Sequence, residues 1–190
     1  MQVVVLEDPL IDSLCTLSCQ SASSDLAGRL SAAGLRVRTA ASPVPFESIL
    51  AAHRTVLLAE LGRHHARAPR DRIAPRLAQD ITAGLAIPDR EHHEALCTLS
   101  HFRNTFWSSF APDDVLLMPA APDVAPKGMA TGDPRLVIPA TALGGAIAGL
   151  RCGSDAATSM PLGAMLMAAP GADARLAGFL LSPLGRSLDL

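Results

Sequence analysis

The sequence has no tyrosine, a single lysine and few aromatic residues, which make up 3% of its 190 residues. It contains no uninterrupted run of roughly 18 apolar residues, so we expect no membrane-spanning helix and no membrane partner. Its first residues, MQVVVLEDP, lack the basic and small-residue features of a signal peptide, which predicts a cytoplasmic protein. The formal net charge is −2 and the arginines are scattered along the chain, so we expect no nucleic-acid partner.

Hydrophobic residues are plentiful, at 49% of the chain, and supply enough material for a core. A length of 190 residues suits one domain, and we expect residues 1–190 to form it. Cys15 and Cys19 are four residues apart, a spacing that could serve zinc on a helix. Further ligands at a fitting spacing are lacking, so we expect packed free thiols and no metal site.

The N-terminal quarter predicts a strand–helix–strand unit. Residues 2–8 are a short apolar run typical of a buried strand, and residues 35–40 alternate as a second strand does. Between them, residues 23–34 begin with serine and aspartate and end at glycine, as helices do. This order favours a parallel pair of strands and an α/β fold.

The middle of the chain, residues 45–110, predicts a helical segment. Its apolar residues recur at helical spacing in three stretches, which are 45–67, 71–86 and 89–110. Phe106 and Trp107 near its end are expected to anchor a helix. The adjacent pairs His64–His65 and His92–His93 point in different directions on a helix, so we expect surface groups and no metal clamp.

After this segment the sequence predicts strands and a long loop. Strands are expected at 114–120, 144–152 and 161–170, a loop at 121–140, and a closing helix at 171–181.

Six short motifs in this C-terminal part follow one another in a characteristic order. They are Leu117–Ala120, Ala125–Gly128, Gly132–Pro134, Pro139–Gly144, MPLGAML at 160–166 and GADARLAGF at 171–179. The order resembles the C-terminal half of the amidase signature family, and the upstream strand, helix and long helix are similar to that family too. The likeness covers residues 1–180 and is most specific over 114–175.

The resemblance implies an α/β/α layered fold with a mixed sheet, here a partial amidase-signature fold with a helical middle segment. It also implies hydrolysis of carbon–nitrogen amide bonds without a cofactor. The family's two serines and lysine lie in its N-terminal half, which this sequence does not resemble, so no catalytic residue is expected here. The implied partners are an N-terminal amidase half or a homo-oligomer, with a small-molecule amide substrate only in the completed enzyme.

The sequence offers few groups that could replace the missing centre. An activated serine needs a base within hydrogen-bond reach, and Lys127 is the only lysine. It lies in a loop, where a solvated role is the simpler interpretation. Ser154 and Ser159 in CGSDAATSM imitate the family's signature, but their place in the motif order indicates a late loop between two strands.

The resemblance assigns a substrate-wall role to the stretch 125–144 and to the strand end before it. Met118 and Pro119 at the strand end, and Thr141 and Leu143 at a turn, are the candidate substrate-binding residues. The alternative is that they serve only as corner and turn residues. The amidase half predicts an open sheet edge where the missing part would pair. The rival function is a non-catalytic remnant that self-associates or binds a partner protein, and it would cover the same edge with a second copy of the chain.

Overall fold

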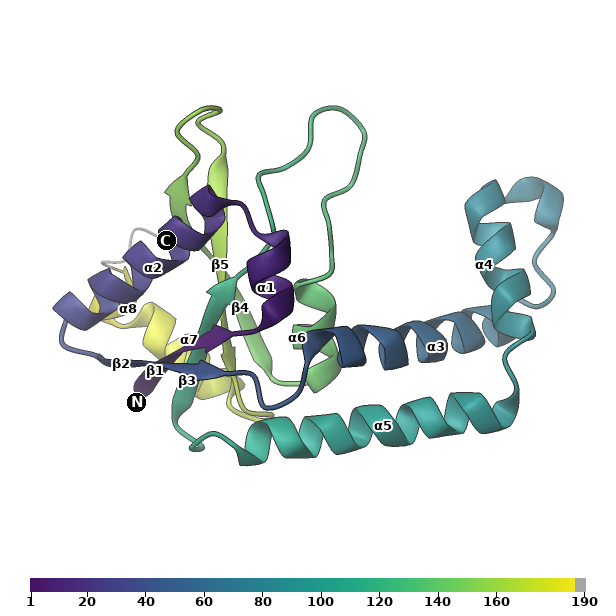
Figure 1. Ribbon diagram of the computed structural model, residues 1–190, viewed down its shortest axis with the longest axis horizontal. Helices are drawn as coiled ribbons and strands as arrows, with labels where there is room; N and C mark the ends of the chain where they lie inside the picture. The colour runs from purple at the N-terminus through teal and green to yellow at the C-terminus, as the bar shows by residue number, and fades with distance from the viewer. Residues whose placement is uncertain (187–190) are drawn as a thin grey trace.

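The apolar run at the N-terminus forms strand β1, Gln2–Glu7, inside a five-stranded mixed sheet of the computed structural model (Figure 1). The structure describes residues 1–186. The other strands are β2 Arg36–Ala41, β3 Asp114–Pro119, β4 Ala146–Ser154 and β5 Pro161–Ala168. Their order in the sheet is β2-β1-β3-β5-β4, so β2 and β4 are the two edges.

Strand directions divide the sheet into two parts. β1 is parallel to both β2 and β3, which confirms the parallel pair that the sequence predicts. β5 runs antiparallel to β3 and to β4. All six residues of the central strand β3 are buried, because helices cover both faces of the sheet.

Helices form a layer on each face of the sheet, which confirms the α/β/α fold class. Helices α2, Leu17–Ala32, and α7, Asp173–Leu181, pack on the face that receives Val115 and Leu117 of β3. The opposite face receives Leu116 and Met118. It is covered by α1 Pro9–Leu14, α6 Val137–Leu143, the first turn of α3 Phe46–His64 and the last turns of α5 Asp89–Ser108. The last helix, α8, is Pro183–Arg186.

Helices α3 and α5 extend together beyond the sheet and carry the short helix α4, Pro75–Leu85, at their far end (Figure 1). A 3-10 turn, Arg70–Arg72, precedes α4. We call α3, α4 and α5 the arm. The three helices predicted in this part of the sequence are all present, with boundaries that differ by a few residues.

Three short-range predictions are wrong. Helix α1 was not expected, although Asp8 caps it and Pro9 occupies its first turn. Helix α2 begins at Leu17 and not at residue 23, because Thr16 accepts a hydrogen bond from the backbone N–H of Cys19. Residues 137–143, expected as loop and turn, form helix α6, which ends at Gly144 with φ 71°.

The state of the cysteines is as expected, but the position of Cys15 and the exposure of one histidine are not. All four cysteines are free thiols, as expected. Cys15 ends α1 while Cys19 lies in α2, so they do not share a helix.

His92, expected at the surface, has a side chain only 13% exposed between α5 and α3. There its Nδ1 accepts a 2.6 Å hydrogen bond from the Arg63 guanidinium. Within residues 1–186, no helix is both long and apolar enough to cross a bilayer.

Candidate functional site: a pocket between a loop and a hairpin

The segment that follows β3 leaves the sheet as a projecting loop that is fixed at its base. The backbone N–H of Ala120 donates to the carbonyl of Gly163 on β5 at 2.9 Å. The carbonyl of Pro122 accepts from the N–H of Thr16, between α1 and α2, at 2.9 Å. The loop therefore starts from a defined position beside the hairpin of β4 and β5, and both project from the same end of the sheet (Figure 1).

A cavity of about 910 Å³ lies between this loop and the tip of the hairpin. We call it the loop–hairpin pocket. Its walls are residues 121–127 and 131–133 on the loop side and residues 157, 158, 160, 161 and 163 on the hairpin side. At Gly163, which lines the hairpin wall, a β-carbon would lie 3.3 Å from that of Ala120, so glycine lets the base of the loop approach β5 closely.

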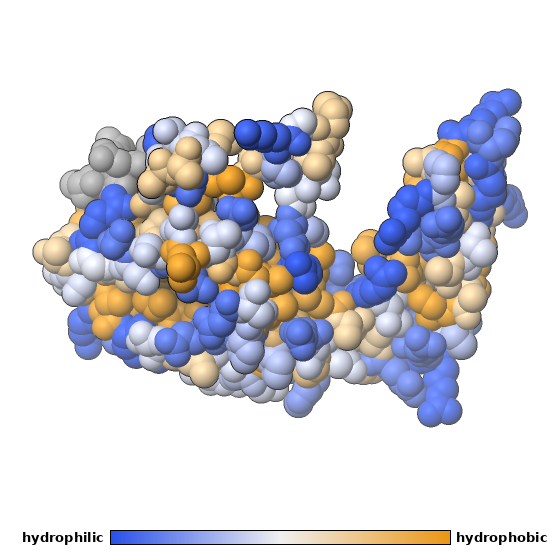
Figure 2. Space-filling model, turned by 45° about the horizontal axis from the view of Figure 1, so that its top comes forward, coloured by the Kyte–Doolittle hydropathy of each residue, from blue (hydrophilic) through white to orange (hydrophobic). Residues whose placement is uncertain are grey.

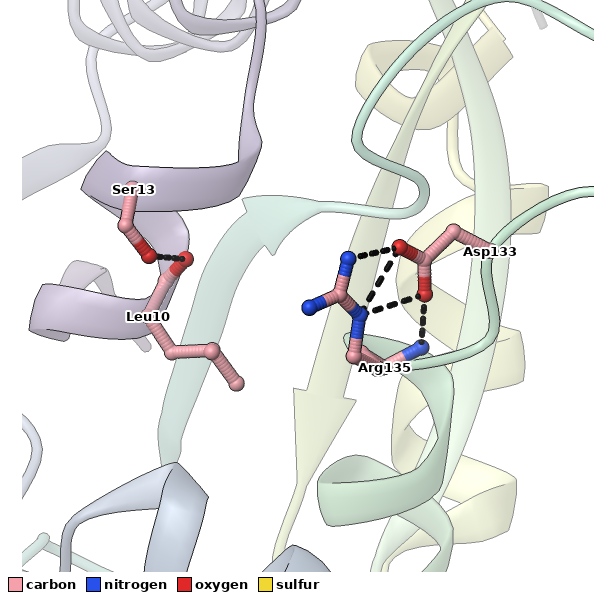
Figure 3. A network of polar contacts seen from close by, with 4 residues as sticks. All are labelled: Leu10, Ser13, Asp133 and Arg135. Carbon is pink, nitrogen blue, oxygen red and sulfur yellow. Dashed lines mark hydrogen bonds and ion pairs between the residues drawn. The ribbon is translucent and has the colours of Figure 1, made fainter.

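Charges at the pocket are partly neutralised within the loop. The Arg135 guanidinium and the Asp133 carboxylate point toward one another at the start of α6, opposite the end of α1 that carries Ser13 (Figure 3). These hydrogen bonds from Arg135 hold the pKa of Asp133 below its usual value. Lys127 is exposed in the wall, and its ammonium group has no hydrogen-bond or ion-pair partner among residues 1–186.

The hairpin wall is tied to helix α2 through Asp155. Its carboxylate accepts from the N–H and hydroxyl of Thr158, at 2.9 and 2.7 Å, and from the hydroxyl of Ser18 at 3.0 Å. These bonds lower the pKa of Asp155. Since Thr158 also lines the pocket, the position of this wall depends on the Asp155 carboxylate.

The four candidate substrate-binding residues lie close in the fold but differ in exposure. Met118 and Leu143 are 0% and 1% exposed and belong to one buried cluster beneath α6. Pro119 is buried at the end of β3. Thr141 is exposed on α6, where its hydroxyl donates to the carbonyl of Val137 at 2.9 Å. Their contact with a substrate stays a prediction.

Two side chains of α5 hold the end of α6 in place. The indole N–H of Trp107 donates to the carbonyl of Leu143 at 2.9 Å, and Arg103 donates to that of Ala142 at 3.0 Å. A β-carbon at Gly145 would lie 2.4 Å from the Trp107 ring, so only glycine fits there. Trp107 therefore anchors α5, as the sequence predicts, and it does so against the segment that carries Thr141.

No family model matches the chain, and no curated protein matches it. Solved structures match its fold. 6-Aminohexanoate cyclic dimer hydrolase, complexed with substrate, has a TM-score of 0.80 at 16% identity, over 100% of this chain and 44% of that chain. A second match is a chain from a vestigial protein complex that is described as revealing the evolutionary origins of an s-triazine catabolic enzyme. It has a TM-score of 0.80 at 20% identity, over 92% of this chain and 40% of that chain. A bacterial aryl acylamidase of the amidase signature family has a TM-score of 0.70 at 15% identity, over 99% of this chain and 45% of that chain.

This chain has a partial amidase signature fold. The match takes in 40 to 45% of each of those solved chains, so more than half of each lies outside the likeness. The resemblance found in the sequence motifs is confirmed at the level of the fold.

Within the described part of this amidase-like chain, no serine is hydrogen-bonded to lysine. The hydroxyl of Ser154, at the end of β4, accepts from Arg151 at 2.7 Å. Ser159 lies in the hairpin at φ 59° and its N–H donates to the carbonyl of Asp155. Neither serine is paired with Lys127, so the Ser–Lys geometry that would activate either serine is missing among residues 1–186.

Residues 1–186 also contain no preformed cluster of three or more metal ligands. No group of three or more His, Cys, Asp and Glu side chains lies together there as a metal site would require. The loop–hairpin pocket, with apolar walls and a few polar side chains, is thus the best candidate for a ligand site in this amidase-like chain.

Proposed function

We propose that this chain forms the substrate-wall and scaffold portion of an amidase-type hydrolase, and that it is inactive without a complementary segment. That segment carries the Ser–Ser–Lys centre. The proposal treats the described chain as one cytoplasmic domain, which suits its four free thiols. The observation that carries it is the loop–hairpin pocket, built from the same loop for which the sequence motifs predict a wall.

The shape of the molecule supports a complementary segment. The surface is hollowed between the body and the arm, with apolar residues along the floor (Figure 2). Large apolar side chains are exposed on two helices, Val137 on α6 at 44% and Leu57 on α3 at 49%. Such surfaces are more often found at interfaces than on isolated proteins.

The lone lysine provides a direct test of amide binding. Because Lys127 is the only lysine and lines the pocket, labelling with ¹⁵N-lysine gives a single backbone amide signal that reports on this site. Turnover of an amide substrate belongs to the completed enzyme, but we expect the wall alone to retain weak amide binding, so this signal should shift saturably on titration with a panel of aryl and alkyl amides, beginning with acetanilide. The absence of a shift with every amide would overturn the wall assignment.

Two loop variants show whether any shift comes from the pocket. Thr131→Trp places a large side chain in the pocket wall and is expected to abolish the shift. Met129→Trp is the matched control, because Met129 is fully exposed in the same loop and does not line the pocket. Equal loss of binding in both variants would argue against the pocket as the site.

The missing centre is tested separately with a fluorophosphonate, which traps activated serines. Intact-mass analysis of the purified chain is expected to show no adduct, with a complete amidase signature enzyme as positive control. An adduct on one serine that disappears in Lys127→Met would mean that the chain carries its own nucleophile. That result would overturn the dependence on a complementary segment.

The rival function, a non-catalytic protein that self-associates, rests on the free edges of β2 and β4. Each edge strand is paired on one side only, which leaves backbone groups available for another strand. Sedimentation of the purified chain distinguishes the two functions. A stable homodimer with no amide-induced shift at Lys127 would favour the rival.

A further inference from the structure

His93 and Cys97 form an exposed pair on helix α5, remote in sequence from the loop–hairpin pocket. They lie one helical turn apart, which brings side chains to the same face. His93 Nε2 and Cys97 Sγ are 3.6 Å apart, and both residues are exposed. The neighbouring residues His92 and His93 point in different directions on the helix, so the pair His92–His93 does not indicate a metal site, whereas the pair His93–Cys97 does.

The distance between these two atoms is that required of ligands on one zinc ion. Tetrahedral zinc has bonds of about 2.3 Å to sulfur and about 2.0 to 2.1 Å to nitrogen, which places the two ligand atoms about 3.6 Å apart. We propose that His93 and Cys97 bind a thiophilic divalent cation, of which Zn²⁺ is the representative. This site is independent of the proposed amidase function.

The pair needs little rearrangement to accept the ion. The same 3.6 Å contact suits a hydrogen bond between the thiol and the imidazole, which holds the two groups together before metal binds. On binding, the Cys97 thiol releases its proton to solvent and the sulfur coordinates as thiolate, while Nε2 coordinates as neutral imidazole. The metal keeps its charge and no oxidant or reductant is needed.

The surroundings leave room for further ligands. The nearby Glu94 carboxylate accepts a 2.7 Å hydrogen bond from Arg90, so it is held by a cation on the preceding turn. Two coordination positions stay open to water or to the same pair on a second copy of the chain. Leu96, beside Cys97 and 39% exposed, gives this face an apolar element for contact between copies.

Cobalt is the first probe, because Co²⁺ bound by thiolate in tetrahedral geometry gives an intense visible spectrum and a thiolate-to-metal charge-transfer band. We expect both features when the reduced, purified chain is titrated with Co²⁺, and their loss when Zn²⁺ is added. One ion per chain indicates completion by water, whereas one ion per two chains with dimer formation in sedimentation indicates completion by a second copy. Either stoichiometry supports the site, and absence of the charge-transfer band overturns it.

Three variants on one exposed helix face locate the ligands. Cys97→Ser and His93→Ala are each expected to abolish the charge-transfer band without changing the circular dichroism spectrum. His101→Ala is the matched control, because His101 lies one turn from Cys97 on the other side, and in residues 1–186 the Cys97 sulfur is hydrogen-bonded to His93 and not to His101. Retention of the band in His93→Ala, or its loss in His101→Ala, would overturn the assignment of His93.

Discussion

A single buried carboxylate, Asp8, joins three elements at the end of β1. One oxygen accepts from the N–H of Leu10 at 2.9 Å and caps α1, and the other accepts from the N–H of Phe46 at 3.1 Å at the start of α3. Burial is the largest influence on the Asp8 carboxyl and raises its pKa, although both hydrogen bonds oppose this. The residue thereby fixes the root of the arm to the sheet.

Asp8→Ala is expected to destabilise the protein by about 2 to 4 kcal/mol, because it removes a helix cap and leaves two buried N–H groups without acceptors. Urea unfolding at neutral pH measures the change. Asp8→Asn keeps one acceptor oxygen and is expected to cost less. Equal losses for the two substitutions would show that the hydrogen bonds do not carry the effect.

The Asp155 carboxylate gives the hairpin wall a predictable dependence on pH. Hydrogen bonds from Thr158 and then Ser18 lower its pKa below the ordinary 3.8. A carboxylate with a lowered folded-state pKa stabilises the fold above its unfolded-state value, and this stabilisation is lost as pH falls through the folded-state pKa. We therefore expect the hairpin tip to loosen only below pH 3.8.

Exchange of the Thr158 amide proton, followed by NMR between pH 5 and pH 2.5, tests this expectation. The amide donates directly to Asp155, so its protection should fall with protonation. Asp155→Asn should show weak protection that does not vary over this range. A pH-dependent loss of protection in Asp155→Asn would assign the effect to another carboxyl group.

Among the elements, the α3–α4 crossing depends on two glycines. A β-carbon at Gly84 would lie 1.8 Å from the carbonyl oxygen of Leu58, and one at Gly62 would lie 2.6 Å from the Gly84 carbonyl carbon. Backbone atoms cannot move aside as a flexible side chain can. The two helices therefore approach at a distance that only glycine allows.

Gly84→Ala is expected to separate α4 from α3, at a cost of about 1 to 3 kcal/mol that outweighs the better helix propensity of alanine. Limited trypsin digestion measures it, since Arg67 and Arg72 lie between the two helices. Cleavage there should accelerate. Gly178→Ala in α7, where a β-carbon meets no atom within 4 Å, should leave the rate unchanged.

Elements with a strong pattern could be predicted from the sequence, and short ones could not. β1, β3 and α5 combine long apolar runs or stripes with clear ends. α1 and α6 have 6 and 7 residues, too few for a periodic pattern, and α6 contains Pro139, which suggested a loop. The pocket was not predictable as a cavity, because it depends on how the loop after β3 meets a hairpin some thirty residues later.

Burial is distributed unequally over the whole molecule. The two large hydrophobic clusters lie on the two faces of the sheet. In residues 51–98 of the arm, by contrast, the buried apolar side chains are Ala59, Ile81 and Ala95. Since buried apolar area is the main source of stability, the outer arm is held much more weakly than the body.

We therefore expect native-state hydrogen exchange to separate the arm from the body. Amides of α4 and of the outer halves of α3 and α5 should exchange through a local opening of low free energy, whereas β1, β3 and β5 exchange only on global unfolding. A partner that fills the hollow between body and arm would raise protection in α4, because the open arm cannot bind it, and would raise that of β3 as well, because the globally unfolded chain cannot bind it either. If α4 already exchanged as slowly as β3 in the isolated chain, the arm would be part of the same cooperative unit, and the need for a complementary segment to stabilise it would disappear.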